Sequence, residues 1–600
     1  MKPAGRLLIG IGVSPGVVVG PAVVVHLTLP EIPQRVVARK DLKGEATRLR
    51  AAVAAVRGYL ETMRGRAARR AGPEEAKIFD AQILMLEDEE FLGGVEGLIR
   101  QNQLSAERAF EFKALEMRAL WADNPRLRER VADLTGVHFR VLQHLLGQPA
   151  DRVPEELGRQ PAVVFTHELT PGLTVQFDRT EVMGYVAEEG TRTSHAAILA
   201  KSLGIPCVMG LVGCLEHIRS GMMVILDGSH GTVLLNPTPQ EIEEAQAQER
   251  RRLELELELE RAVAQPAVTL DGARITLRGN VDLPEELESA AQHGAEGVGL
   301  LRTEFLILGR SDLPTEDEQV LYYTRVGERF AGQPVVVRSY DLGGDKFPLN
   351  QGLEPEANPF LGWRALRVCL DRPEIFRGQI RALLRARART NVHLMIPLVT
   401  QVEEVERTRE LMAEETERLR REGLPVGADL PLGIMVETPA AVVMMDRLIE
   451  LSDFVSVGTN DLTQYTLVVD RGNARLAERF SSFHPAVVRS LKAVVDAAGR
   501  AGKEAAVCGE MASEPAGAYL LLGLGYRVLS TSPPRLPMVR WLVRQVDLAQ
   551  AKGTAEAALE ARTTREVQEV LDAAVAQHLD PRALGVRPLP SPRSRTTLKG

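Results

Sequence analysis

The sequence predicts an α/β multidomain protein in which a helical bundle interrupts a β/α domain and a (β/α)₈ barrel follows. Three observations lead to this fold class. Between about residues 37 and 148, proline and glycine become sparse and apolar residues recur every three or four positions, as on one face of a helix. Strand-and-turn sequence lies on both sides of that segment, at 7–25 and 160–235. Beyond it, eight short apolar runs alternate with amphipathic stretches, which is typical of a parallel barrel.

The N-terminal strands are predicted from "LLIGIGVSPGVVVGPAVVV", where glycine and proline turns separate apolar runs. We expect these strands to pair with those after residue 160, so that the helical part is an insertion. Its first helix is indicated by six apolar residues at helical spacing: Leu42, Leu49, Val53, Val56, Leu60 and Met63. Three further helical stretches are predicted near 74–94, 105–121 and 126–147.

A charged segment at 238–265 connects the two halves of the chain. Its core, "LELELELE", alternates with the period of a strand, but its flanks are rich in Glu, Ala, Gln and Arg, which favour a helix. We therefore predict a linker helix.

The barrel is predicted from its apolar runs, which are separated by helical text such as "VEEVERTRELMAEETERLRREG". Eight strands over roughly 300 residues match the size of a (β/α)₈ barrel. The runs lie near 274–280, 296–301, 334–340, 392–398, 431–437, 453–458, 504–509 and 526–531.

Composition narrows the class of protein. Six hundred residues predict two to four domains, and 73 basic against 81 acidic residues give no general attraction to nucleic acid. No apolar run approaches the ~20 residues needed to cross a bilayer, so membrane insertion is not expected. The first residues are too glycine-broken for a secretion signal. Four widely spaced cysteines without a C-x-x-C pair suit free thiols in a reducing cytoplasm.

Charged residues follow the apolar runs at the predicted carboxyl ends of the strands, where a barrel places its chemistry. Arg302, Arg338 and Arg471 are expected to converge on an anion, because guanidinium groups bind phosphate and carboxylate in pairs of hydrogen bonds. Glu437 and Asp461 are expected to hold one divalent cation, since two carboxylates plus substrate oxygens commonly bind Mg²⁺. For any single one of these residues a solvated or ion-paired role is the ordinary interpretation, but five at the strand ends of one barrel favour a site. Cys508 after the seventh run is either core filler or catalytic.

The stretch "TRTSHAAILAKSLGIP", residues 191–206, predicts a helix that starts at Ser194 and stops at Gly204. His195 then lies in the first turn, where free N–H groups disfavour an imidazolium and stabilise an attached phosphate. A nucleophile is one interpretation and a packed or surface histidine the ordinary one. A metal ligand is disfavoured, because no second His or Cys lies at ligand spacing on the same helix.

These motifs, taken in order, resemble Enzyme I of the phosphoenolpyruvate-dependent sugar phosphotransferase system (phosphoenolpyruvate–protein phosphotransferase). The likeness extends from about residue 8 to 570. "RTSHAAILAKSLGIP" resembles the phosphohistidine motif of that family, and "MLEDEEF" a segment of its carrier-docking domain. The motifs that resemble its PEP site are "GAEGVGLLRTEFL", "VRSYDLGGDK", "NPFLGWRALR", "IMVETPAA", "VGTNDLTQYTLVVDRGN" and "CGEMA".

The resemblance implies a role for each site residue. His195 would be the phosphorylated nucleophile, and Cys508 would protonate the departing enolate to give pyruvate. Glu437 and Asp461 would hold Mg²⁺. PEP would be bound by Arg302, Arg338, Asn460, Asp461 and Arg471. The helical insertion would dock the small carrier protein HPr, and the barrel would form a homodimer.

The resemblance also implies the domain boundaries. Residues 1–33 and 149–236 would form a swivelling phosphohistidine domain, with the HPr-binding bundle inserted at 34–148. A linker helix at 237–266 would lead to the PEP- and Mg²⁺-binding barrel at 267–578. Residues 579–600, whose composition is typical of disorder, would form a tail. Because His195 and the PEP site fall in different domains, we expect a swivelling movement through the segments near 150–160 and 236–265.

Four residues depart from the family pattern: Thr191, Lys201, Gln82 and Thr135. Three of them replace a glycine, an arginine and a histidine respectively, and Thr135 replaces a basic residue of the helical domain. The last two departures predict a divergent or specialised HPr.

Three other interpretations are less favoured. A pyruvate phosphate dikinase or PEP synthase shares the swivelling domain and barrel, but it needs an ATP-binding domain, and no G-x-x-x-x-G-K loop is present. A regulatory protein that senses PEP has no need of the proton donor Cys508. A purely structural protein leaves the ordered motifs unexplained.

Overall fold

The computed structural model describes residues 6–25, 32–33, 35–122, 131–147, 160–177, 181–191, 194–307, 310, 312–343, 356, 358–427, 429–471, 473, 475–476 and 479–578. The chain divides into two compact units, and the boundary between them falls between Leu253 and Glu254. We describe the N-terminal and C-terminal units in turn. No helix in the described ranges is long and apolar enough to cross a membrane.

The N-terminal unit contains a mixed sheet with the strand order β1-β8-β7-β3-β4-β5-β6-β2. The central strands β3 and β4 are parallel neighbours, with Val23 opposite Val164, although the whole helical stretch lies between them in the sequence. The bundle is therefore an insertion between two adjacent strands, as predicted. The strands are β1 (Arg6–Ile9), β2 (Ile11–Ser14), β3 (Val17–Val25), β4 (Ala162–Glu168), β5 (Val182–Glu189), β6 (Cys207–Met209), β7 (Met223–Asp227) and β8 (Thr232–Leu235).

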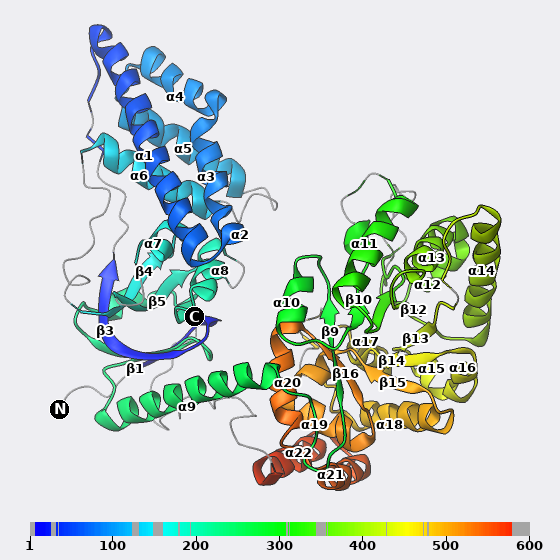
Figure 1. The fold of residues 1–600 in the computed structure, drawn as a ribbon. Helices are drawn as coiled ribbons and strands as arrows, with labels where there is room; N and C mark the ends of the chain where they lie inside the picture. Colours follow the sequence, from blue (N-terminus) through cyan, green and yellow to red (C-terminus); the bar gives the residue numbers. More distant parts are fainter. Residues whose placement is uncertain are drawn as a thin grey trace. The chain divides into compact units, whose positions relative to one another are not determined.

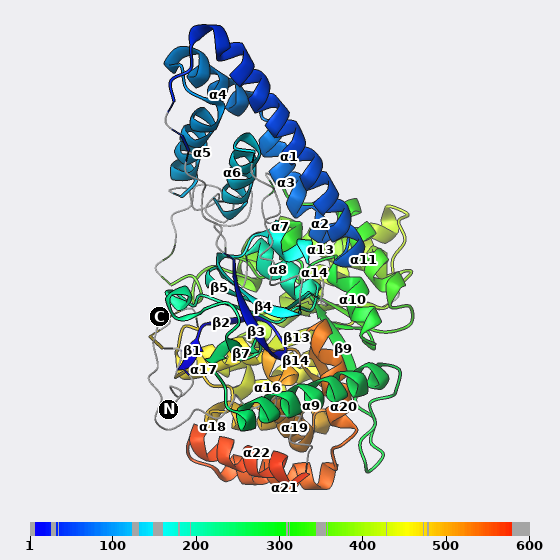
Figure 2. The ribbon, with the colours of Figure 1, turned by 90° about the vertical axis from the view of Figure 1, so that its left-hand side faces the viewer.

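The inserted bundle packs around its long first helix, α1 (Leu42–Arg70), which runs along the bundle in both views (Figures 1 and 2). Five of the six residues that indicated this helix are buried, and Leu42 is partly buried. The predicted stretch at 74–94 is not one helix but parts of three, because Asp88 accepts hydrogen bonds from the amides of Glu90 and Phe91 and starts a new helix there. The other bundle helices are α2 (Pro73–Ala76), α3 (Ile78–Glu87), α4 (Glu89–Asn102), α5 (Ala106–Ala122) and α6 (Val131–Leu145).

The predicted linker is a continuous helix, α9 (Pro239–Val263), which crosses the boundary between the units (Figure 1). In its N-terminal half Glu249 accepts a hydrogen bond from the Val17 amide at 2.9 Å. In its C-terminal half Glu258 accepts one from the Trp541 indole at 2.9 Å. The Leu-Glu alternation is therefore helical, and the strand period was misleading.

The C-terminal unit is a closed barrel of eight parallel strands, β9 through β16 in sequence order. Each of the eight apolar runs contains or overlaps one strand, which confirms the predicted fold class. The strands are β9 (Thr276–Val281), β10 (Val298–Leu301), β11 (Val335–Arg338), β12 (Val392–Ile396), β13 (Leu432–Val436), β14 (Phe454–Val457), β15 (Glu504–Val507) and β16 (Val528–Thr531).

Helices surround the barrel strands (Figure 1). Together with strand residues, they bury the largest apolar cluster in the described ranges, which includes Leu394, Val436 and Leu520. The helices are α10 (Glu286–Gln292), α11 (Glu316–Arg329), α12 (Leu366–Asp371), α13 (Pro373–Arg387), α14 (Val402–Arg421), α15 (Pro439–Val443), α16 (Met445–Leu451), α17 (Thr459–Leu467), α18 (Pro485–Arg500), α19 (Pro515–Leu524), α20 (Leu536–Val543), α21 (Leu548–Glu560) and α22 (Thr564–His578).

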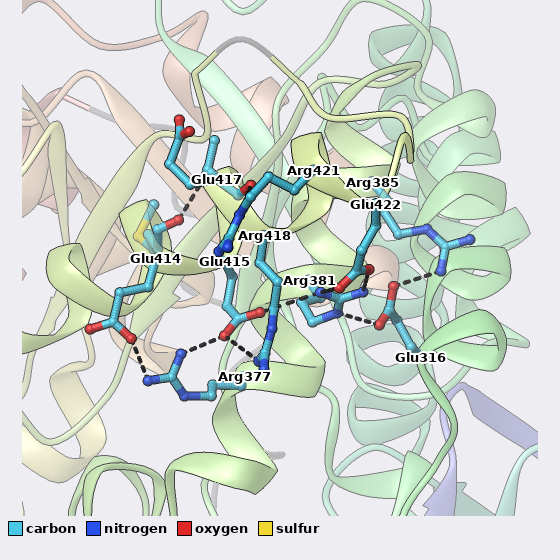
Figure 3. Close-up of polar contacts among 12 residues, drawn as sticks. Glu316, Arg377, Arg381, Arg385, Glu414, Glu415, Glu417, Arg418, Arg421 and Glu422 are labelled. Carbon is cyan, nitrogen blue, oxygen red and sulfur yellow. Dashed lines mark hydrogen bonds and ion pairs between the residues drawn. The ribbon is translucent and has the colours of Figure 1, made fainter.

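Three of these outer helices, α11, α13 and α14, share a network of ion pairs (Figure 3). The Glu415 carboxylate on α14 is 1% exposed, and its two oxygens accept from Arg377 and Arg381 of α13. Arg381 also pairs at 2.6 Å with Glu316 and with Glu422. The network therefore satisfies both oxygens of its most buried carboxylate.

Candidate active site

A cavity of about 920 Å³ opens at the carboxyl ends of the barrel strands. Its walls come from residues that follow the strands directly, because a parallel barrel brings all these strand ends to one rim. All seven site residues predicted in the barrel line this cavity: Arg302, Arg338, Glu437, Asn460, Asp461, Arg471 and Cys508.

Arg338 is the last residue of β11 and the most enclosed cation of the cavity, at 7% exposure. It pairs with Glu304 at 2.6 Å and with Asp341 at 2.8 Å. Burial opposes its charge, but the neighbouring carboxylates outweigh burial and raise the pKa of Arg338. Its Nε has no hydrogen-bond partner among the described residues, so this donor is left for a ligand.

Three further charged residues surround Arg338 and were not predicted from the sequence: Glu304, Asp341 and Arg364. Arg364 donates to Asp341 at 2.5 Å, and Asp341 thus bridges two guanidinium groups. Burial alone would raise the pKa of Asp341, but Arg338 and Arg364 outweigh it and lower that pKa. Glu304, Asp341 and Arg364 lie in the motifs "LLRTEFL", "VRSYDLGGDK" and "NPFLGWRALR". The sequence alone does not show that side chains from these three separate segments form ion pairs.

Arg302 and Arg471 occupy more exposed positions in the same cavity. Arg302 pairs with Asp282 at 2.7 Å, and both side chains are nearly half exposed. Arg471 lies 4.0 Å from Oδ1 of Asp461. An exposed ion pair such as Arg302–Asp282 is weak, and Arg471 lies at the distance limit of an ion pair with Asp461. An entering anion can therefore compete for both guanidinium groups.

Glu437, directly after β13, and Asp461, in the first turn of α17, present buried oxygens to the cavity. Oε1 of Glu437 accepts a hydrogen bond from the Leu398 amide at 2.5 Å. Oε2 of Glu437 and Oδ1 of Asp461 are buried without a hydrogen-bond partner in the part of the chain that the structure describes. Burial, followed by repulsion from Asp341 and Asp461, raises the pKa of Glu437. A cation would relieve both the missing contacts and the repulsion.

The donor set therefore fits a hard divalent cation bound by oxygen. No cluster of three or more His, Cys, Asp or Glu side chains suited to a metal occurs within the described ranges, so the protein would supply two carboxylates and leave other positions to substrate and water. Eight carboxylates and five arginines line the cavity. This excess of negative charge means that an anionic substrate would benefit from a cation at the same place.

Cys508 directly follows β15 and is buried, with its Sγ 3.6 Å from the Val457 carbonyl oxygen, to which it donates. Burial raises the pKa of the Cys508 thiol to about 11, although a hydrogen bond with Ser456 opposes the shift. The group therefore stays a neutral thiol near pH 7. Such a group suits donation of a proton more than nucleophilic attack, which requires a thiolate.

His195 is the first residue of α8 (His195–Ser202) in the N-terminal unit. Ser194 caps this helix as predicted, and its hydroxyl accepts from the Ala197 amide at 3.4 Å. The His195 ring is about one-third exposed, and its Nδ1 lies 2.9 Å from Oδ2 of Asp133 on α6. In the neutral ring this contact places the proton on Nδ1 and the lone pair on Nε2.

Asp133 is the site residue of this unit that the sequence reasoning missed. Its side chain is 1% exposed, and its other oxygen accepts from the Gln82 amide group at 3.0 Å. Gln82, noted above as a departure from the family pattern, thus orients Asp133, which in turn orients His195. Because Asp133 and His195 lie 62 residues apart, no local motif could pair them.

The other departures have local roles. Thr191 accepts a backbone hydrogen bond from the Ser194 amide at 3.2 Å. Lys201 lies exposed in the last turn of α8, where the helix dipole favours a positive charge. The Thr135 hydroxyl donates to the Val131 carbonyl at 2.9 Å within α6.

Three family models match the chain, and together they cover both units. They are described as PEP-utilising enzyme, N-terminal, at residues 9–130; PEP-utilising enzyme, mobile domain, at residues 158–231; and PEP-utilising enzyme, PEP-binding domain, at residues 256–548. The three models, one on the bundle, one on the sheet domain and one on the barrel, therefore identify the chain as a PEP-utilising enzyme.

Curated relatives narrow the class to one family. A phosphoenolpyruvate-protein phosphotransferase of Geobacillus stearothermophilus is 38% identical over 560 residues, which cover 93% of this chain and 96% of the relative. One of Listeria innocua is 37% identical over 574 residues, covering 95% and 99%. The chain belongs to the phosphoenolpyruvate-protein phosphotransferase family and is a transferase that uses PEP as phosphoryl donor.

Proposed function

We propose that this protein transfers the phosphoryl group of PEP to Nε2 of His195 and then to a histidine of HPr, releasing pyruvate as the first step of sugar uptake. One observation carries the proposal. The barrel cavity combines arginines for an anion, two carboxylate oxygens without hydrogen-bond partners among the described residues for a cation, and a protonated thiol at Cys508. This set suits a phosphorylated enol that must lose its phosphoryl group and gain a proton.

The residues divide the chemistry between them. Arg302, Arg338 and Arg471, with Asn460 and Asp461, hold and orient PEP in the cavity. The Nε2 lone pair of His195 forms the new P–N bond while the P–O bond to the enol oxygen breaks, and the bond electrons leave with the enolate. The Cys508 thiol then gives its proton to the enolate carbon, which yields pyruvate, and the thiolate regains a proton from water.

We propose that Mg²⁺ is the cation and that Glu437 and Asp461 are its protein ligands. When bound, Mg²⁺ supplies neutralisation of negative charge on the phosphate oxygens. Oε2 of Glu437 and Oδ1 of Asp461 both lack a hydrogen-bond partner among the described residues, which supports this assignment.

The predicted domain boundaries remain part of the proposal. His195 belongs to the N-terminal unit and the cavity to the C-terminal unit, so turnover requires that the His195 domain moves. We expect the movement to pass through the segment at 236–265, which contains α9, and through the segment near 150–160, of which residues 150–159 lie outside the described residues. A crosslink that joins the two domains should abolish turnover, and normal turnover of the crosslinked protein would contradict the movement.

The proposed partners are HPr and a second copy of the chain. Exposed apolar side chains on α3 and α5 support carrier docking to the bundle; they are Leu84, Phe112, Leu115 and Leu120. Exposed Val443, Met444 and Val468 on the barrel support dimerisation there. Four free, buried cysteines support a cytoplasmic location. The tail at 579–600 lies outside the described residues.

The test is phosphoryl transfer from ³²P-labelled PEP with Mg²⁺, comparing the unaltered protein with His195→Ala and adding HPr from the same cell. Acid-labile label on the unaltered protein only, which is chased onto HPr, is the expected result. Label that remains on the protein would contradict HPr as acceptor. Binding of PEP without any label would contradict transfer and favour a PEP sensor, and labelling of His195 by ATP would favour a dikinase.

A further inference from the structure

Three strained backbone positions of the barrel lie next to, or within a few residues of, side chains that line the cavity or contact them. Five described residues other than glycine have a positive φ, and three of them are in the barrel: Ala365, Leu398 and Val468. Ala365 follows the cavity residue Arg364, Val468 precedes the cavity residue Arg471 by three positions, and Leu398 donates to Glu437. Bulky residues rarely adopt this conformation, and where they do the strain often serves a site.

Leu398 is the clearest of the three. It has a φ of 56° and is 4% exposed, so a bulky side chain is held in a conformation that favours glycine. The chain is fixed on both sides of it. Upstream, β12 pairs with β13 up to Ile396. Downstream, the amides of Thr400 and Gln401 both donate to Glu404, at 2.7 and 3.0 Å, in the capping box of α14.

This conformation aims the Leu398 amide at the cation site. The N–H donates to Oε1 of Glu437 at 2.5 Å, and the next carbonyl, that of Val399, accepts from the Thr438 hydroxyl at 2.7 Å. The two contacts hold Glu437 and Thr438 against one loop. They engage one oxygen of Glu437, whereas Oε2 has no partner within the described ranges and lies 3.1 Å from the ideal Cβ position at Gly458.

We propose that Leu398 is a positioning residue whose left-handed backbone fixes the rotation of the Glu437 carboxylate, so that Oε1 is occupied by the protein and Oε2 is presented to a divalent cation. The inference rests on the proposed cation site and adds to it the reason that one oxygen remains available. It predicts that cation affinity depends on the backbone conformation at 398 more than on the volume of the side chain.

Two substitutions separate these contributions. Leu398→Gly removes the side chain but adopts a φ of 56° without strain, so Mn²⁺ affinity should stay within about threefold of the unaltered protein even though packing is lost. Leu398→Ile conserves volume, but β-branched residues tolerate a positive φ least, so Mn²⁺ affinity should fall by about tenfold, the usual effect of losing a group that orients a metal ligand. A residue that only packs would give the opposite order, with glycine the worse variant.

A backbone ester isolates the hydrogen bond itself. Incorporation of the α-hydroxy analogue of leucine at 398 removes only the N–H, and Mn²⁺ affinity should again fall by about tenfold. The matched control is the equivalent ester at Asn236, which also has a positive φ but lies in the N-terminal unit, where its amide donates to the Met223 carbonyl at 2.9 Å. This control should leave Mn²⁺ affinity unchanged.

Mn²⁺ binding is measured on the full-length protein without PEP by electron paramagnetic resonance, and thermal melts confirm that each variant is folded. Weaker binding by Leu398→Ile and by the 398 ester, with Leu398→Gly retained, supports the proposal. Equal affinity in all variants, the reverse order, or no Mn²⁺ binding by the unaltered protein overturns it. Labelling by PEP tests the proposed function separately, so the two failures are distinguishable.

Discussion

Two arginine–carboxylate networks lie in the same barrel, one among α11, α13 and α14 and the other around Arg338 in the cavity. In the outer network both oxygens of the buried Glu415 have guanidinium partners (Figure 3). In the cavity network Arg338 and Arg364 also pair with carboxylates, but each leaves its Nε without a partner among the described residues. A network that closes on itself stabilises the fold, whereas one that leaves buried groups unpartnered is prepared for a ligand.

The strongest test of this comparison is Glu437→Gln. The change is nearly isosteric and keeps an oxygen for the Leu398 amide, but it places a neutral group where we expect the cation ligand. Phosphoryl transfer from PEP should fall by about 10³-fold or more, measured as the rate of labelling of His195. Thermal stability should stay equal or rise, because the neutral Gln side chain has no repulsion from Asp341 and Asp461 and a smaller desolvation cost. A clear loss of stability would show that this carboxylate is structural.

Glu415→Gln is the matched change in the outer network. It leaves Arg377 and Arg381 facing a neutral side chain, which should cost about 3 kcal/mol of stability. Calorimetry of the full-length protein should show a lower melting temperature for the barrel. The rate of phosphoryl transfer below that temperature should be unchanged, and a slower rate in a fully folded variant would break the distinction between the two networks.

His138 tests whether a missing hydrogen-bond partner always marks a ligand site, because it lies outside the candidate sites. It is fully buried in the bundle, and neither ring nitrogen has a partner in the described structure. Burial, with a smaller contribution from Arg118, lowers the pKa of His138 to about 4. The unfolded chain, with a pKa near 6.5, binds a proton at higher pH than the folded one, so stability is lost as the pH falls from 6.5 towards 4.

Between pH 7 and pH 5 this group should cost the bundle about 2 kcal/mol. His138→Leu should remove that pH dependence and leave phosphoryl transfer unaffected. Calorimetric melts at the two pH values measure the first effect, and PEP labelling the second. A variant that folds normally but no longer transfers to HPr would show that an unpartnered buried group marks function here as well.

Asp133 tests the converse case, because its carboxylate has hydrogen-bond partners on both oxygens and yet lies beside His195, the proposed nucleophile. Both of its oxygens are engaged, by Gln82 and by His195. Asp133→Asn should slow labelling of His195 by about tenfold, as expected for loss of a group that orients a ligand or nucleophile. The KM for PEP should not change, because PEP binds in the other unit. An altered KM with an unchanged maximal rate would contradict a positioning role.

Much of the barrel site follows from the sequence because a strand end is a local signal. Arg302, Glu437 and Cys508 each directly follow a strand. Closure of the barrel brings them together, whatever conformation the loops adopt. The ion pairs of Glu304, Asp341 and Arg364 could not be predicted, because they depend on the conformation of the loops. The contact of Asp133 with His195 could not be predicted, because it forms only when α6 of the inserted bundle packs beside α8 of the sheet domain.

Two further differences between the predicted and the observed structure arise where a local interaction overrides the intrinsic conformational preference of a residue. The stretch at 74–94 has continuous helical propensity, but the Asp88 side chain caps a new helix within it, and caps override propensity at single positions. The positive φ of Leu398 could not be predicted from the sequence, because leucine disfavours this conformation and the surrounding hydrogen bonds impose it.

The protonated state of Cys508 also bears on how the protein withstands oxidants. With a pKa of about 11, only about one molecule in ten thousand carries the thiolate at pH 7, and peroxide reacts with the thiolate. The other three cysteines are buried too, and burial raises their pKa values as well. The neutral Cys508 thiol is therefore a poor target for peroxide and alkylating agents. In the proposed reaction, the same protonated state that would let Cys508 donate its proton would also protect the thiol between turnovers.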